Sequence, residues 1–211
     1  GYIYTPPVPP LISDIIAAEF DSSGDTVWTK RYDFSDSEGG RSINLARSGN
    51  IAITGWSGDS SSWGCFTMKC DYDGDTIWTR TFRSPLGKDY GWAITTDSGE
   101  NVFVSGWGYS ESVSIVDSSK FLVLKYDSQG DTVWTSLYSF ALFNFAGPSI
   151  LLDSSHDLIV SGHVGETSGD LLTFKLRDGT GIEESPLNTH SNSGQLFPNQ
   201  PNPFCDRTDI S

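Results

Sequence analysis

Short stretches in which apolar and polar residues alternate recur through the first 178 residues, and this alternation predicts β-strands. Residues 65–70 form one such stretch, and a Gly-containing turn joins them to a second stretch at 76–82. A longer loop leads to residues 92–96, which a tight turn joins to residues 101–105. We therefore expect four short antiparallel strands within residues 65–107, together forming one four-stranded sheet.

This strand pattern is repeated along the chain. The phrase Gly-Asp-Thr-Val/Ile-Trp-Thr begins at Gly24, Gly74 and Gly130, so its copies start 50 and 56 residues apart. A repeat of this length is typical of solenoids and propellers, in which each unit buries its faces against its neighbours. Four antiparallel strands per unit favour propeller blades. We expect an all-β fold over residues 1–178, a partial β-propeller of roughly 50-residue blades with three full repeats and incomplete ends.

Two sets of repeated residues are expected to hold the repeats together. A Trp recurs in the second strand of each repeat, and one Trp side chain can bury roughly 150–250 Å². Packing between neighbouring blades is therefore the preferred role, with ligand stacking as the alternative. A Gly recurs near the end of the fourth strand. The structural residues expected on this basis are Trp28, Trp78, Trp134, Gly55, Gly106 and Gly162.

The repeat phrases resemble those of the bacterial β-propeller repeat family. The segment YDSQGDTVW at 126–134 and the segment AITTDSGENVFVSG at 93–106 are similar to its Tyr-Asp-Ser-x-Gly-Asn-x-x-Trp and Ala-Ile-x-x-Asp-x-x-Gly-Asn units. The resemblance covers residues 1–178 and implies structural repeats. The family carries no agreed catalytic residues, so none are assigned here.

A change of composition follows the repeats. Residues 179–195 are polar and turn-rich and predict a flexible linker. The segment LFPNQPNPF at 196–204 then resembles the opening of the C-terminal sorting domain of type IX secretion cargo. That resemblance implies the beginning of an immunoglobulin-like domain at 196–211, truncated at Ser211. It also implies contact with an export machinery and a location outside the cell or on the outer-membrane surface of a Gram-negative-type bacterium.

Composition excludes several classes of partner. The 13 basic and 27 acidic residues give a net charge of −14, which argues against binding to a nucleic-acid backbone. The chain contains no run of about 20 apolar residues, so no transmembrane segment is predicted.

Cys65 and Cys70 lie at an odd separation on one predicted strand, so they face opposite sides and are expected to fill cores rather than pair.

No cofactor or metal is expected from the motifs. The chain has no His/Cys cluster with zinc spacing. The acidic phrase at 71–75 has its Gly at the fourth position instead of the sixth, and Phe82 stands where a calcium loop needs a bidentate Glu. A hairpin turn is the preferred interpretation.

The connections between hairpins are long and differ from copy to copy, whereas the turns within hairpins are short and uniform. We expect the long loops to share one rim of the fold and to carry any ligand site, because function concentrates in variable loops on rigid scaffolds. Packing within the repeat is the preferred role for Trp56, Trp107 and His163, with ligand contact as the alternative. The ligand-binding candidates are Glu38, Arg41, Trp63, Lys88, Asp89, Tyr90 and Tyr109, with Trp56, Trp92, Trp107 and His163 beside them.

These features favour a secreted or cell-surface module that binds or scaffolds a protein or carbohydrate, rather than an enzyme. The alternatives are a glycan-active hydrolase or lyase, and an accessory domain of an enzyme located upstream. A hydrolase would need converging carboxylates. Glu38 and Asp89 occupy matched positions, but the third copy has Phe145 there.

Overall fold

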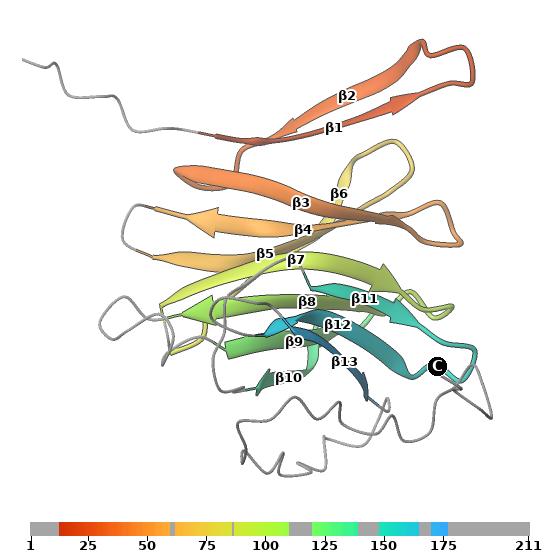
Figure 1. Cartoon of the computed structure of the whole chain (residues 1–211). Coiled ribbons are helices and arrows are strands. Elements are labelled where there is room, and N and C mark those ends of the chain that lie inside the picture. Colours follow the sequence, from red (N-terminus) through yellow and green to blue (C-terminus); the bar gives the residue numbers. More distant parts are fainter. Residues whose placement is uncertain are drawn as a thin grey trace, which may run out of the picture.

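The computed structural model describes residues 13–59, 62–85, 87–109, 120–138, 148–164 and 170–176, and every regular element there is a β-strand (Figure 1). The expected all-β class is confirmed. Within these residues no helix is long and apolar enough to cross a membrane. The expected linker and sorting domain, at 179–211, lie outside the described residues, as does Phe145.

The antiparallel pairings divide the strands into four groups in chain order, which we call sheets I to IV, and one parallel bridge joins sheets II and III. Sheet I holds β1 (Ile15–Phe20) and β2 (Thr26–Tyr32). Sheet II holds β3 (Ser37–Leu45), β4 (Ile51–Gly58), β5 (Trp63–Cys70) and β6 (Thr76–Phe82). Sheet III holds β7 (Lys88–Thr96), β8 (Val102–Tyr109), β9 (Lys120–Tyr126) and β10 (Thr132–Tyr138). Sheet IV holds β11 (Ser149–Leu152), β12 (Leu158–Val164) and β13 (Asp170–Leu176).

The grouping of strands differs from the expected four-stranded unit at 65–107. Strands β5 and β6 pair with β3 and β4, whereas β7 and β8 pair with β9 and β10, and both groups belong to one eight-stranded hydrogen-bonded sheet. Between β5 and β7 the only pairing is one parallel bridge, from Trp63 to Lys88. The eight-residue register of β4 on β5, from Ile51↔Cys70 to Gly58↔Trp63, is what joins the two hairpins. Repeat length alone does not decide which adjacent hairpins pair, so the sequence unit and the sheet are out of phase by one hairpin.

The sheets follow one another in chain order from β1 and β2 to β12 and β13 (Figure 1). Alternate residues of one strand enter different cores, so neighbouring sheets pack face to face. In β9, Leu122 and Leu124 pack toward sheet II, while Phe121 and Val123 pack toward sheet IV. Because successive side chains of a strand point to opposite faces, the central sheets are buried on both sides. Cys65 and Cys70 follow the same rule: both are free and fully buried, in different cores, as expected.

The short turns all have one geometry. In the turn 71–75, the amide of Gly74 donates to the carbonyl of Asp71 at 3.1 Å, and Oδ1 of Asp71 accepts the amides of Asp73 and Asp75 at 3.0 and 2.8 Å. Gly74 has a φ of 79°, in the left-handed region that Gly adopts without strain. The hairpin-turn prediction for 71–75 is therefore confirmed.

Each repeated Trp of β2 and β6 lies on the short turn of the next sheet. Nε1 of Trp28 donates to the Tyr72 carbonyl, and Nε1 of Trp78 donates to the Ser128 carbonyl, both at 3.2 Å. A Cβ added to Gly130 would lie 2.7 Å from the Trp78 ring. Glycine is therefore needed in this turn for two reasons: it adopts the positive φ, and it leaves room for the Trp ring. Trp134 packs at the edge of the core between sheets III and IV.

A buried ion pair joins sheets II and III at the short-turn end. Nζ of Lys69 lies 2.6 Å from Oε2 of Glu100, and the Lys69 side chain is 3% exposed. Glu100 occupies the turn position that Gly49 fills in the preceding copy and His156 in the following one, and it has a positive φ of 63°. Hydrogen bonds from Lys69, and then from Ser48 and Asn50, lower the pKa of Glu100 to about 2.

Replacing Glu100 with Gln should therefore weaken folding in a pH-dependent way. A folded-state pKa of about 2 against an ordinary value of 4.5 means that the stabilisation is complete above pH 4.5 and is lost as the pH falls toward 2. At pH 7 we expect a loss of about 1.5–3 kcal/mol in the free energy of unfolding, the usual range for a hydrogen bond to a charged group, because Lys69 loses its charged partner. Urea titrations between pH 2 and 7 should show this difference closing with acid. Glu19→Gln, at an exposed position, is the control.

Candidate functional site

The described parts of three long connections, those after β2, before β5 and before β7, lie at one rim, as the loop lengths predict. The hydroxyls of Ser35 and Ser57 lie 3.0 Å apart, joining the loop after β2 to the end of β4. Oγ of Ser62 donates to the Gly87 carbonyl at 3.4 Å, joining the loop before β5 to the loop before β7. Loops of two sheets are thus connected at this rim, while the short turns lie at the opposite end of the strands.

Five aromatic side chains form a continuous row at this rim, which we call the aromatic ladder. It consists of Trp56, Trp63, Tyr90, Trp107 and Tyr109, all partly exposed. The ring centroids are 4.3 Å apart for Trp56 and Trp63, and 6.0 Å apart for Trp63 and Tyr90. Tyr90 then lies 4.6 Å from Trp107, which lies 5.3 Å from Tyr109. The ladder therefore crosses from sheet II to sheet III.

Strand register explains the ladder. Tyr90 and Trp107 are directly opposed in the β7–β8 pair, where side chains of one face meet. Trp63 starts β5 at the bridge to Lys88, which brings it beside β7. Nζ of Lys88 lies 5.6 Å from the centroid of the Trp63 ring, so a positive charge borders the aromatic surface. The rim therefore combines stacked rings with a cation.

Arg41 and Trp92 form a second contact between the two sheets. Each is the residue skipped by its strand's pairing register, at the bulge before Ser42 and before Ala93. The Arg41 guanidinium lies 4.9 Å from the centroid of the Trp92 ring. Because of the matched bulges, neither residue is paired across its strand, and the two side chains can contact each other.

Asp89 is buried, in contrast to its expected place on an exposed rim. Its side chain accepts hydrogen bonds from the amide of Ser84 at 2.6 Å and from the Ser84 hydroxyl at 2.7 Å. Burial raises its pKa above the ordinary value. Asp89 therefore closes the loop between β6 and β7 and is not available to a macromolecular ligand.

Glu38, at the matched position before β3, is also buried but is paired differently. Oε1 accepts the Phe34 amide at 3.0 Å, which corresponds to the amide contact of Asp89. Phe34 stands where the next copy has Ser84, so no hydroxyl reaches the second oxygen. Among the described residues, the buried Oε2 of Glu38 has no hydrogen-bond partner.

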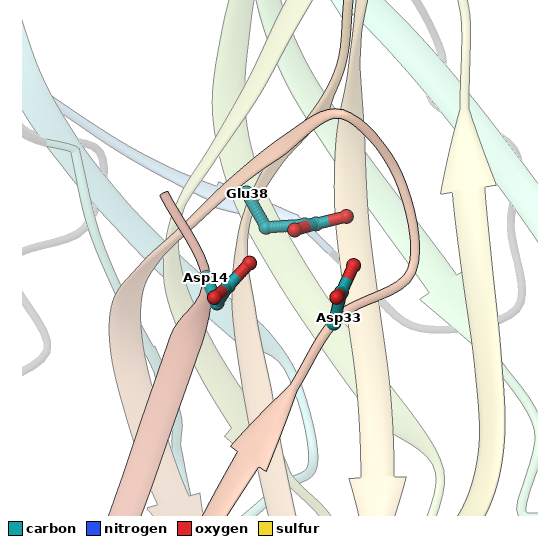
Figure 2. A group of neighbouring side chains, drawn as sticks. All are labelled: Asp14, Asp33 and Glu38. Atoms are coloured by element: carbon teal, nitrogen blue, oxygen red, sulfur yellow. The ribbon is translucent and has the colours of Figure 1, made fainter. Parts of the chain in front are cut away.

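Glu38 belongs instead to a carboxylate cluster with Asp14 and Asp33. Figure 2 shows the three carboxylates directed toward one another from the start of β1, the end of β2 and the start of β3. One oxygen from each residue lies within 4.8 Å of the others. Backbone contacts place the cluster: the Glu38 amide donates to the Ser13 carbonyl at 2.6 Å, and the Ser13 hydroxyl donates to the Glu38 carbonyl at 2.7 Å.

A pocket of about 410 Å³ connects the cluster to the ladder. It lies between the start of β1 and β3 and opens at the long-loop rim. Its lining includes Asp14, Ile15, Glu38, Gly39, Arg41 and Trp56. A Cβ on Gly39 would lie 2.5 Å from Nε1 of Trp56, so the indole covers the backbone at the pocket wall. Two of the three carboxylates, those of Asp14 and Glu38, therefore share one recess with the first ring of the ladder.

Asp14 and Asp33 were not predicted as site residues, although their positions at the two ends of one hairpin indicate that they lie close together. Asp14 immediately precedes β1 and Asp33 immediately follows β2, so the hairpin pairing Ile15↔Tyr32 sets them across from each other. The side chain of His163 lies outside the described residues. Cys65 offers no nucleophile, because burial raises its pKa to about 12 and keeps the thiol protonated.

A scan of known protein families finds none that matches this chain. A search of curated proteins likewise finds no significant match.

Proposed function

We propose that this chain is part of a β-propeller that acts as a binding or scaffolding module, with a protein or glycan bound at the long-loop rim. Support for the propeller comes from two four-stranded antiparallel groups, sheets II and III, that a single parallel bridge joins, and from the Trp-to-turn contact that recurs between sheets. Exposed apolar side chains on β1 and β3, such as Ile16 at 67% and Leu45 at 70%, support further repeats beside sheet I.

The aromatic ladder is the observation that carries the binding proposal. Partly exposed aromatic faces offer a stacking surface to the apolar face of a sugar ring, or to aromatic and aliphatic side chains of a protein. Rows of aromatic residues with a neighbouring cation are typical of recognition surfaces, where Tyr and Trp are enriched. Lys88, at the edge of the ladder, would favour an anionic group on the ligand.

Export to the cell surface is the second part of the proposal. It rests on the phrase at 196–204 and its resemblance to the sorting domains of type IX secretion cargo. The partner at that end of the protein would be the export machinery, and the ligand at the rim would be met outside the cell.

The enzyme alternative is weaker at the residues that motivated it. A catalytic acid or base must reach a substrate proton directly or through one water molecule. Asp89 is fully buried and held by Ser84 through both of its oxygens, so the carboxylate pair expected for a hydrolase is not formed at matched positions.

Binding can be tested by titrating the full chain with acidic and neutral oligosaccharides and with fragments of bacterial surface proteins, following Trp fluorescence. We expect a ligand whose affinity falls about tenfold or more in Trp63→Ala and Tyr90→Ala, because each change removes one stacking face. Tyr72→Ala is the matched control, since Tyr72 is 66% exposed in a short turn at the opposite end. Equal losses in all three variants would contradict a rim site.

A further inference from the structure

Glu38 differs from its counterpart in the next copy in one respect. Both carboxylates are 0% exposed and both accept a loop amide. Asp89 receives a hydroxyl from Ser84 on its other oxygen, whereas Oε2 of Glu38 has no donor among the described residues. A buried carboxylate oxygen without a partner is costly, so the position is expected to be filled by something that neutralises it.

Asp14 likewise has one carboxylate oxygen without a hydrogen-bond partner among the described residues. Arg31 pairs with Oδ2 of Asp14, while the buried Oδ1 has no partner among the described residues. Asp33 faces Asp14 across the end of the β1–β2 hairpin, and like charges directly opposed on neighbouring strands are destabilising. Three carboxylates and one guanidinium leave a net charge of −2 at this point, which one divalent cation would balance.

The separations fit an oxygen-preferring cation. Calcium binds carboxylate oxygens at roughly 2.3–2.6 Å, so two of its ligands are at most about 4.6–5.2 Å apart. The three oxygens of the cluster lie within 4.8 Å of one another, inside that limit. The adjoining pocket leaves room for the water molecules that complete such a coordination sphere. The Arg41 guanidinium does not compete, because it stacks on Trp92.

We propose that Asp14, Asp33 and Glu38 bind a divalent cation, Ca²⁺, at the long-loop rim. The ion links the start of β1 and the end of β2 to the start of β3. It thereby holds sheet I against sheet II beside Trp56, the first ring of the aromatic ladder. This site is independent of the acidic turn at 71–75, where Asp71 already accepts two backbone amides.

The test uses the full chain, stripped with EDTA and then titrated with CaCl₂ by calorimetry, together with thermal unfolding in EDTA and in Ca²⁺. We expect one binding event and a Tm that rises by several degrees in Ca²⁺, because a ligand that binds only the folded state stabilises it. Asp33→Asn, at an exposed position, should weaken Ca²⁺ binding about tenfold or more while the protein still folds. Asp73→Asn, in the acidic turn, should leave binding unchanged.

Glu38→Gln adds a readout that a purely structural role would not produce. In EDTA its Tm should equal or exceed that of the unmodified chain, because one charge of the repelling cluster is gone and the amide can donate to Asp14. In Ca²⁺ the order should reverse. The proposal is overturned if the unmodified chain shows neither Ca²⁺ binding nor a Tm shift up to about 10 mM, well above the range of weak extracellular sites. An equal response to Mg²⁺ would overturn the choice of Ca²⁺, and loss of binding in Asp73→Asn would move the site to the turn.

Discussion

Gly106→Ala is expected to disrupt the fold, whereas the same change at Gly162 is expected to be tolerated. A Cβ on Gly106 would lie 1.9 Å from the carbonyl oxygen of Tyr90, across the β7–β8 pair. Backbone cannot yield as a flexible side chain can, so strand pairing must break. At Gly162 the nearest atom among the described residues would be 3.6 Å away, on the Phe121 ring, which is ordinary contact.

The bulge before Ala93 causes this difference. It brings the Tyr90 carbonyl over Gly106, and the matched bulge in β3 places the Gly39 carbonyl 1.7 Å from a Cβ on Gly55. The β11–β12 register has no shift across its described pairs. We expect Gly106→Ala to cost more than the roughly 1–3 kcal/mol typical of overpacking, and Gly162→Ala to cost less than about 1 kcal/mol. Urea unfolding of both variants measures this, and similar losses would show that close packing at the glycine is not the cause.

The strands were predictable because their signals are local. Alternation and turn residues gave β5, β6 and the turn between them, since both depend on neighbours in sequence. The pairing of β4 with β5 was not predictable, because adjacent hairpins of a tandem repeat can join in either phase.

The candidate site was predictable in part for the same reason. Loop length alone indicated the rim that carries Trp63 and Tyr90. Glu38 and Asp89 were expected there as exposed groups. Their burial depends on a hydrogen bond from the preceding loop, which repeat alignment does not show. The cluster of Asp14 and Asp33 with Glu38 needs both the hairpin pairing and the contact of Ser13 with β3, and the second of these is a tertiary contact.

Trp78→Ala is expected to cost about 3–5 kcal/mol in the free energy of unfolding, the usual range for removing a buried large aromatic side chain. Trp78 is 7% exposed in the core between sheets II and III, and its ring packs 5.8 Å from that of Tyr126. Its indole nitrogen also satisfies the Ser128 carbonyl. The change therefore removes apolar contacts, leaves a cavity and releases one inter-sheet hydrogen bond.

Trp28→Ala separates these contributions. Trp28 makes the same 3.2 Å hydrogen bond to the next turn, but it is only partly buried. If burial dominates, Trp28→Ala should cost clearly less than Trp78→Ala, measured by urea unfolding with unchanged m-values. If the bond from indole to turn dominates, the two losses should be equal. The first result would place the strength of the stack in its central core. Equal losses would show that the hydrogen bond from the repeated Trp to the next turn contributes similarly to stability at each pair of sheets.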